Sequence, residues 1–358
     1  MPSMRSSMRS SLVLLLAFSL SVLADYRVAT SFKLDVHSHV IPDIYRSALI
    51  DAGYPVTNGT LYTDGFPVPS WDLKAHIAAM DSLGVNYSTI SISAPGVNFL
   101  ANDPRAAAKL ARSLNNIMYK YTKSYPDRLG AMCILPLPHI DLALREIKYC
   151  LDVLKFDGVG LYTNADGTYL GDAVLNPVFE LLNSRSVTVF VHPAAPGCQG
   201  AAIGHPGPMT EYPFESVRAM ENMLLTGQRA NYSAINIIFP HGGGAMPYLA
   251  TRIAGMASLS FLGSLNVVDS LNQFKGYLFD TASSTTSIQL LSMNLFGGVN
   301  KIVTGTDYPY VPLAQASPGL QAIQANGNYT TSQMAQINSQ NALNIFPGVA
   351  KKLGFKLI

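Results

Sequence analysis

Short apolar runs alternate with longer amphipathic stretches along most of the chain. The short runs have the length and composition of buried parallel strands, which are apolar on both faces and therefore lack a polar side. The longer stretches repeat apolar residues at intervals of three and four, as helices with one buried face do. The predicted strands are residues 33–37, 87–93, 130–135, 158–162, 187–192, 236–239, 276–280 and 301–304. The predicted helices are residues 73–83, 103–125, 140–154, 176–184, 214–226, 246–256 and 287–295.

Eight strands in alternation with helices predict an α/β fold, a (β/α)8 TIM barrel. A doubly wound open sheet has the same local signature and is the alternative. No Gly/Ser/Pro-rich linker divides the chain, so residues 25–358 are predicted to form one barrel domain. The stretch 54–69 is rich in Gly, Pro and Tyr and is predicted to be a long loop over one mouth of the barrel.

The first 24 residues have the pattern of a secretory signal peptide. Arg5 and Arg9 precede an apolar segment, residues 12–24, which ends in Val22-Leu-Ala24. This segment is short for a bilayer span, so we expect cleavage after Ala24 rather than an uncleaved anchor. The mature chain is then predicted to have no membrane span and to pass through the secretory pathway, either to the outside or to an internal compartment.

The acceptor sequons and the cysteines also bear on whether the chain enters the secretory pathway. Four Asn-x-Ser/Thr triplets are compatible with a glycosylating compartment. They begin at Asn58, Asn86, Asn231 and Asn328. The three cysteines, Cys133, Cys150 and Cys198, form neither a zinc cluster nor a disulfide framework; one bridge can form, and buried free thiols are the favoured prediction.

Composition excludes several classes of protein. Hydrophobic residues make up 48% of the chain and charged residues only 13%, which argues against a disordered chain. Of 24 basic residues, two lie in the signal segment, so 24 − 2 = 22 basic residues face 22 acidic ones in the mature chain. No basic stripe is present, and the sequence therefore predicts no nucleic-acid partner.

Five polar residues fall at the ends of the predicted strands. His37 and His39 end the first strand, and a strand sends residues i and i+2 to the same face. His192 ends the fifth strand, His241 follows the sixth and Asp307 follows the eighth. The carboxyl ends of barrel strands meet at one mouth, where active sites of this fold are built. The sequence therefore predicts a metal site there, since imidazole and carboxylate groups are metal ligands.

The motifs around these residues resemble a known family. They are Asp35-Val-His37-Ser-His39, Phe190-Val-His192-Pro193, Pro240-His241-Gly-Gly-Gly-Ala245 and Gly305-Thr-Asp307-Tyr-Pro309. Their ordered set resembles the amidohydrolase-related decarboxylases of the aminocarboxymuconate-semialdehyde decarboxylase type over nearly all of residues 33–350. Within that family the chain resembles the fungal enzymes that decarboxylate 6-methylsalicylate.

The resemblance implies a role for each matching position. His37, His39, His192 and Asp307 would ligate one divalent metal, and His241 would stand beside it as a catalytic acid/base. Three imidazoles and one carboxylate suit Zn²⁺, with Mn²⁺ as the alternative because a harder ion suits oxygen-rich substrates. Many hydrolytic relatives bridge two metals through a lysine on the fourth strand, and residues 158–162 contain none, so a mononuclear site is expected.

One departure from the family pattern concerns the substrate. The family's aminocarboxymuconate enzymes carry an arginine shortly before the Trp-Asp pair, and residues 62–71 contain no arginine. A dicarboxylic substrate is therefore disfavoured, and Phe66 and Trp71 are predicted to line a site for a small aromatic acid, unless they only pack on the barrel. Arg252 matches an arginine that in the family reaches a neighbouring subunit's site, which predicts a homodimer; a surface ion pair is the alternative.

These inferences predict a metal-dependent decarboxylase of a small hydroxybenzoate. The expected reaction is 6-methylsalicylate to 3-methylphenol (m-cresol) and CO₂, in polyketide secondary metabolism, with His241 and Asp307 as the catalytic residues. The alternative is hydrolysis of a lactone or ester at the same metal.

Overall fold

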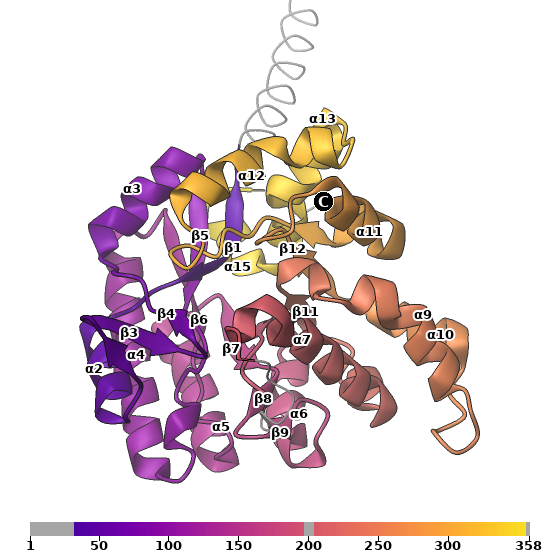
Figure 1. Cartoon of the computed structure of the whole chain (residues 1–358), viewed down its shortest axis with the longest axis horizontal. Helices are drawn as coiled ribbons and strands as arrows, with labels where there is room; N and C mark the ends of the chain where they lie inside the picture. Colours follow the sequence, from indigo (N-terminus) through magenta and orange to yellow (C-terminus); the bar gives the residue numbers. More distant parts are fainter. Residues whose placement is uncertain (1–31, 197–203, 356–358) are drawn as a thin grey trace, which may run out of the picture.

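The computed structural model describes residues 32–196 and 204–355, which include an eight-stranded parallel sheet. Figure 1 shows the strands at the centre of the molecule, with helices around them. The predicted signal segment, residues 1–24, lies outside the described residues. The strands pair in the order in which they occur along the chain. They are β1 (Leu34–His39), β5 (Tyr87–Ser91), β6 (Leu129–Cys133), β7 (Gly158–Tyr162), β10 (Thr188–His192), β11 (Asn236–Phe239), β12 (Leu278–Asp280) and β13 (Ile302–Val303).

Backbone hydrogen bonds between the first and the last strand close this sheet. The Val36 N–H donates to the Thr304 carbonyl at 2.9 Å, and the His39 N–H donates to the Tyr308 carbonyl at 2.7 Å. In return, the Asp307 N–H donates to the His37 carbonyl at 2.8 Å. The predicted (β/α)8 barrel is therefore confirmed, and the open-sheet alternative is wrong.

Helices follow the strands and cover the outside of the barrel. They are α2 (Asp43–Asp51), α3 (Leu73–Leu83), α4 (Pro104–Ser124), α5 (Ile140–Lys148), α6 (Asn176–Ser184), α7 (Gly207–Leu225), α8 (Gln228–Asn231), α9 (Met246–Ala257), α10 (Val267–Lys275), α11 (Ser287–Gly297), α12 (Leu313–Asn326), α13 (Thr331–Ala335), α14 (Asn341–Ile345) and α15 (Pro347–Lys352). Short helical turns are η1 (Asn98–Leu100), η2 (Tyr149–Leu154), η3 (Ala173–Leu175), η4 (His241–Gly243), η5 (Val299–Lys301) and η6 (Gln336–Gln340). Within the described ranges, no helix combines the length and the apolar character that a bilayer crossing requires.

Local sequence explains where several helices begin. The Asp72 carboxylate accepts a hydrogen bond from the Ala75 N–H at 2.9 Å and so caps α3. The Asp103 carboxylate caps α4 in the same way, and Pro104 occupies the first helical position, where its missing N–H has no cost. These caps fix the α3 and α4 starts that the sequence pattern predicts to within one residue.

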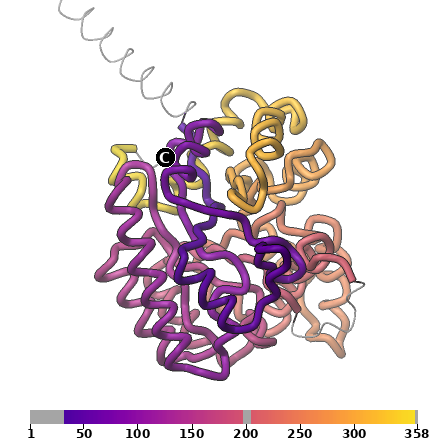
Figure 2. The backbone as a smooth tube through the Cα atoms, turned by 60° about the vertical axis from the view of Figure 1, so that its left-hand side comes forward, coloured from indigo at the N-terminus to yellow at the C-terminus, as the bar shows by residue number. Residues whose placement is uncertain are grey.

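The C-terminal helices close the amino-terminal end of the barrel. Phe346 and Val349 pack with the barrel residues Leu34, Phe190 and Ile238 in one buried apolar cluster. The two ends of the described chain lie side by side, and the rings of Phe32 and Phe355 are 4.7 Å apart (Figure 2). The amino-terminal end of the barrel is thus filled with apolar side chains, which leaves the other end for the polar residues.

Residues 54–69, predicted as an irregular loop, form a small antiparallel sheet instead. Its strands are β2 (Val56–Thr57), β3 (Thr60–Thr63) and β4 (Phe66–Pro67), and a second hairpin pairs β8 (Asn164–Ala165) with β9 (Thr168–Tyr169). Gly65 turns the β3–β4 hairpin at φ +74°, where a Cβ atom would lie 3.2 Å from Pro206 Cα. The Gly207 N–H donates to the Asp64 carbonyl at 2.9 Å, so the hairpin is held against the start of α7.

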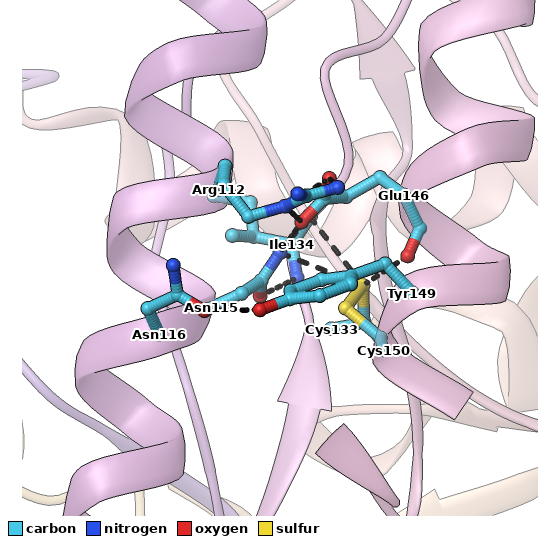
Figure 3. Close-up of a disulfide and its surroundings, with 8 residues drawn as sticks. All are labelled: Arg112, Asn115, Asn116, Cys133, Ile134, Glu146, Tyr149 and Cys150. Carbon is cyan, nitrogen blue, oxygen red and sulfur yellow. Dashed lines mark hydrogen bonds and ion pairs between the residues drawn. A yellow bond between two sulfur atoms is a disulfide. The ribbon is translucent and has the colours of Figure 1, made fainter. Parts of the chain in front are cut away.

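A disulfide joins Cys133, at the end of β6, to Cys150, in η2. Figure 3 shows that the buried Glu146 lies beside it, where its carboxylate accepts hydrogen bonds from Arg112 and from Asn115. The prediction of free thiols is therefore wrong for these two cysteines. The fold brings their Cα atoms to 6.0 Å, within the range that a disulfide spans.

We expect the double variant Cys133→Ala, Cys150→Ala to be less stable than the wild type by about 3 kcal/mol, because the disulfide lowers the conformational entropy of the unfolded chain by closing a short loop. The sequence separation is 17 residues. Urea unfolding followed by circular dichroism measures the difference. A reductant should lower the midpoint of the wild type and leave that of the double variant unchanged; equal midpoints for both oxidised proteins would contradict the expected stabilisation.

Candidate metal centre and active-site cavity

Four histidines and one aspartate meet at the carboxyl end of the barrel. His37 and His39 belong to the end of β1, His192 ends β10, His241 begins η4 directly after β11, and Asp307 follows β13. The Nε2 atoms of His37 and His39 are 3.0 Å apart. Asp307 Oδ1 lies 3.3 Å from His37 Nε2 and 3.2 Å from His39 Nε2. The residues that the sequence predicts as a site are therefore brought together.

In each of the three buried histidines of the centre, His37, His39 and His192, the other ring nitrogen already has a partner. His37 Nδ1 lies 2.8 Å from Asp280 Oδ2, and His192 Nδ1 lies 2.7 Å from the Pro193 carbonyl oxygen. Both partners are acceptors, so each Nδ1 carries the proton and each Nε2 offers its lone pair to the centre. Three Nε2 lone pairs would then converge, provided that His39 has the same tautomer.

Ser91 supports that tautomer for His39. The Ser91 hydroxyl lies 3.0 Å from His39 Nδ1 and donates its own proton to the Ser38 carbonyl at 3.2 Å. Because its hydrogen is used there, the hydroxyl oxygen is free to accept the His39 Nδ1–H. The arrangement of donors therefore fits a divalent cation bound by imidazoles and a carboxylate.

The charges of the centre also favour a cation. Burial opposes a charge on His37, yet the Asp280 and Asp307 carboxylates outweigh it and raise the pKa of His37 to about 10. Burial lowers the pKa of His39 and of His192, and neutral imidazoles are the form that binds metals. Although burial alone would raise it, the pKa of Asp307 is held well below its usual range by the surrounding histidines. Without metal, the extra proton on His37 supplies the positive charge that a bound metal ion would otherwise supply.

His39 and His241 differ in how they face the centre. Single ligand atoms of His37, His192, His241 and Asp307 lie within 4.8 Å of one another, so geometry alone permits His241 as a ligand. His39 is fully buried and held by Ser91, whereas the His241 side chain is 17% exposed and lines the cavity above the centre. His241 Nε2 lies 3.4 Å from Asp307 Oδ2. The two positions suit a ligand and a proton-transfer group, respectively.

Asp280 belongs to the centre, although the sequence pattern does not single it out. Its carboxylate is fully buried and holds His37 through Oδ2, while Oδ1 accepts the His241 N–H and the Ala282 N–H, each at 2.9 Å. One carboxylate thus orients a predicted ligand and the backbone of the predicted acid/base. The available signal was its place at the end of the predicted seventh strand, next to the mouth that carries the other site residues.

We expect Asp280→Asn to weaken metal binding about 10–100-fold, the usual cost of losing a carboxylate that orients a metal-binding histidine. The amide keeps the shape but removes the charge beside His37. Metal titration in competition with a chelator measures the affinity. Asp157→Asn, which changes a carboxylate at the opposite end of the barrel, is the matched control and should leave the affinity unchanged; the same affinity in both variants would contradict the role of Asp280.

A cavity of about 440 Å³ opens above the centre. His192, His241 and Asp307 form its floor, and Tyr212 and Tyr310 form parts of its wall. Its remaining lining comes from Thr63, Phe66, Ser93, Ala94, Pro208, Met209, Pro213, Gly244, Ser283, Ser284, Gln289, Val311 and Gln315. None of these lining residues is Lys or Arg. The cavity has the size of a site for a small ring compound and no fixed side-chain cation for a second carboxylate.

Two of the three predicted substrate-binding residues lie outside this lining. Phe66 lines the cavity, with its ring 6.4 Å from that of Tyr310. The Trp71 indole N–H donates to His76 Nδ1 at 3.0 Å, and its ring packs on Tyr121, so Trp71 makes the barrel contacts that were the alternative for it. Arg252 is exposed on α9 and contributes nothing to the cavity of this chain.

Comparison with known proteins gives one family for the whole barrel. The model of the amidohydrolase family matches residues 34–348. A decarboxylase of Aspergillus niger is 32% identical over an aligned length of 328 residues, and the match covers 88% of this chain and 87% of the relative. The 6-methylsalicylic acid decarboxylase of Penicillium expansum is 31% identical over an aligned length of 324 residues, and the match covers 88% of this chain and 96% of that enzyme.

A solved structure shares the fold. It is a dihydroxybenzoic acid decarboxylase from a Polaromonas species with bound manganese and the inhibitor 2-nitroresorcinol. The two structures superpose with a TM-score of 0.74 at 23% identity, over 90% of this chain and 99% of the other. The family model, the fungal relatives and the shared barrel agree: this chain belongs to the amidohydrolase family.

Proposed function

We propose that the protein is a metal-dependent, non-oxidative decarboxylase of a small hydroxybenzoate, with 6-methylsalicylate as the expected substrate and 3-methylphenol and CO₂ as products. The observation that carries the proposal is the histidine and aspartate centre beneath a cavity whose lining, among the described residues, holds neither lysine nor arginine. A substrate with one carboxylate suits such a cavity, since the centre supplies its positive charge. The named activities of the fungal relatives support the same reaction.

We propose His37, His39, His192 and Asp307 as the ligands of one divalent ion. The absence of a lysine from β7 supports a mononuclear site. The donor set of three imidazoles and a carboxylate favours Zn²⁺. Manganese in the Polaromonas enzyme and the oxygen groups of a hydroxybenzoate favour Mn²⁺. Metal analysis of protein purified without chelator decides between them, and two ions per chain would contradict the mononuclear site.

The proposed reaction replaces the carboxylate with a proton. The bound ion would supply the positive charge that holds the substrate carboxylate and the neighbouring phenol oxygen. Asp307 lies between the centre and the cavity, where its carboxyl group would protonate the ring carbon that bears the carboxylate. That carbon then has four substituents, its bond to CO₂ breaks, and the electron pair restores the aromatic ring. His241, 3.4 Å from Asp307, would relay the proton from the open side.

The purified protein loaded with metal should release CO₂ from 2-hydroxybenzoates. The assay presents a panel of hydroxybenzoates and a panel of lactones and esters, and it follows CO₂ and the release of acid separately. Release of CO₂ with formation of the matching phenol supports decarboxylation. Acid release from a lactone or ester without any CO₂ would instead establish the hydrolase alternative.

We expect His241→Ala to keep its metal and to lose about 10²–10⁴-fold in kcat, the range for loss of a positioned proton-transfer group. The side chain lines the cavity and its Nε2 faces Asp307, so its removal leaves the proposed ligands in place. Metal content and steady-state rates of the variant are measured together. Loss of the metal along with activity would reclassify His241 as a ligand.

We propose that the chain forms a homodimer through its α9–α11 surface. Tyr248 on α9 is 89% exposed, Phe261 in the loop after α9 is 78% exposed, and Ile288 and Leu295 on α11 exceed 80%. Exposed apolar side chains in such numbers are typical of a protein interface. Arg252 lies one helical turn from Tyr248. Light scattering should give a dimer mass for the wild type and a monomer mass for Leu295→Glu; a monomeric wild type would contradict the proposal.

We also propose that the protein passes through the secretory pathway and carries N-linked glycans. The Asn residues of all four sequons are exposed, and the disulfide is of a kind that forms in oxidising compartments. They are Asn58, Asn86, Asn231 and Asn328. Protein from a eukaryotic secretory host should begin at Asp25 and shift in mass on treatment with a peptide N-glycosidase. An intact Met1 and an unchanged mass would contradict both predictions.

A further inference from the structure

A buried hydroxyl group beside the centre has no role in the reaction as proposed so far. Ser284 lies in the loop between β12 and α11 and is 3% exposed, and it lines the cavity together with His241 and Asp307. In the order of the barrel, β12 stands between β11 and β13. The Ser284 hydroxyl is therefore on the wall between the strand that precedes His241 and the strand that precedes Asp307.

This hydroxyl is free to bind a ligand. Within residues 32–196 and 204–355, the Ser284 hydroxyl makes no hydrogen bond to another side chain or to the backbone. Two other polar groups of the cavity are already used: the Tyr212 hydroxyl donates to Asp64 Oδ2 at 2.6 Å, and the Gln289 amide donates to the Ser283 carbonyl at 3.1 Å. The Ser284 oxygen is open to the cavity, unlike Ser216 Oγ, which is sealed in the interior without a partner, so a molecule in the cavity can pair with it.

The surrounding backbone fixes the position of this side chain. The Ser284 N–H donates to the Thr281 carbonyl at 3.0 Å, which holds the turn after β12. Gly242 has φ +65°, and a Cβ atom there would lie only 3.1 Å from Ser284 Oγ. Glycine directly after His241 thus leaves the space that the serine side chain occupies. The hydroxyl is held next to the backbone of the proposed acid/base and does not belong to a freely moving loop tip.

The cavity therefore has two unlike walls. Phe66 and Ala94 place apolar groups beside Thr63 and Ser93 on the side above β1 and β5, whereas Ser284 gives the cavity a hydrogen-bonding group on the side of β12 next to His241. On the proposed function, the centre takes the carboxylate and the neighbouring phenol oxygen. If the substrate ring carries a further oxygen atom, that oxygen would then be the group that hydrogen-bonds the Ser284 hydroxyl.

We propose that Ser284 is a specificity-determining residue that hydrogen-bonds a ring oxygen of the substrate outside the pair held at the centre. The inference rests on the proposed function and extends its substrate class from 6-methylsalicylate to derivatives that carry a further hydroxyl group on the ring. A free hydroxyl on the cavity wall discriminates by leaving itself unpaired when the substrate lacks that oxygen.

The test compares substrates that differ by one oxygen atom. The metal-loaded enzyme is assayed with 2-hydroxy-6-methylbenzoate and with its three derivatives that carry one more hydroxyl, at C3, C4 or C5. We expect one derivative to have a higher kcat/KM than the parent in the wild type. In Ser284→Ala, kcat/KM for that derivative should fall about 3- to 10-fold, the effect of losing one neutral hydrogen bond, and kcat/KM for the parent should change less than about twofold.

Matched variants remove other hydroxyl groups of the same cavity. Ser283→Ala changes the exposed neighbour, and Thr63→Val changes a buried residue of the opposite wall; both should keep the wild-type ratio between the derivative and the parent. Equal losses for all four substrates in Ser284→Ala would overturn the inference, because the serine would then act on the carboxylate or on the loop. Loss of the preference in Thr63→Val alone would overturn it as well.

Binding of the corresponding phenols separates this inference from the proposed function. Calorimetry measures the dissociation constants of 3-methylphenol and of its hydroxylated derivatives for the metal-loaded wild type and Ser284→Ala. If no hydroxybenzoate releases CO₂, the proposed function fails, while a preference for one hydroxylated phenol that is lost in Ser284→Ala still supports the serine as a recognition group. Identical affinities in the two proteins would overturn the inference in either case.

Discussion

His192→Ala should abolish turnover and lower the metal content of the protein together. The side chain is 4% exposed, and its Nδ1 is held by the Pro193 carbonyl, so the ring presents Nε2 to the centre in a fixed orientation. Loss of a partner that only orients a ligand costs about 10–100-fold in metal affinity or activity, and loss of the ligand itself should exceed that range. Metal analysis after gel filtration and CO₂ release from the same sample measure both effects.

A buried histidine outside the centre provides the matched control. His76 is 1% exposed, accepts the Trp71 indole N–H and packs against the ring of Tyr308. His76→Ala should keep its metal, although it loses buried packing. If His192→Ala binds as much metal as His76→Ala does, His192 is not a ligand and His241 takes its place among the candidates.

The eight strands were predictable from the sequence because the interior and the helix layer bury both of their faces. Residues such as Val189, Phe190 and Val191 are each at most 1% exposed, which gives continuous apolar runs of strand length. The helices that escaped prediction lack a clear signal. α12 contains Pro318 and Gly319, which resemble a turn, and α10 buries only Ser270 and Phe274, so its apolar face is narrow.

The centre was predictable because its residues stand at the ends of strands that the fold must bring together. The spacing of His37 and His39 indicates one common face, and their Nε2 atoms are 3.0 Å apart although the pairing of β1 with β5 is irregular between Asp35 and Ser38. Asp280 shows the limit of such reasoning. A carboxylate at the end of a strand can belong either to a turn or to a functional site. Only the contacts of Asp280 with His37 and His241 distinguish these two possibilities.

Contacts between residues that are brought together only by the tertiary fold could not be predicted from the sequence pattern. The pairing of Cys133 with Cys150 requires that η2 return to the end of β6, which no local signal specifies. Likewise, Phe66 and Trp71 lie close together in the sequence, yet the β3–β4 hairpin places Phe66 on the cavity and leaves Trp71 beside His76. Their apolar character predicts that such residues are buried, but tertiary packing decides whether they line the cavity or pack elsewhere on the barrel.

Asp307→Asn should nearly abolish decarboxylation while part of the metal remains bound. The amide has the shape of the carboxylate and keeps one oxygen for a metal, but it cannot deliver a proton to the ring. In the wild type the Asp307 carboxylate contacts His37, His39 and His241, so it stands where a proton relayed from the cavity reaches the centre. Loss of a positioned proton-transfer group alone lowers rates about 10²–10⁴-fold.

Reaction in deuterium oxide tests the origin of that proton. The phenol formed by the wild type should carry one deuterium at the carbon that lost the carboxylate, which NMR or mass spectrometry detects. Asp307→Asn should form almost none of this product at equal metal occupancy, and added metal should not restore the rate. Near-normal deuterated product from the metal-loaded variant would mean that Asp307 serves only as a ligand. His241, whose Nε2 lies 3.4 Å from Asp307 and faces the cavity, would then be the residue that delivers the proton.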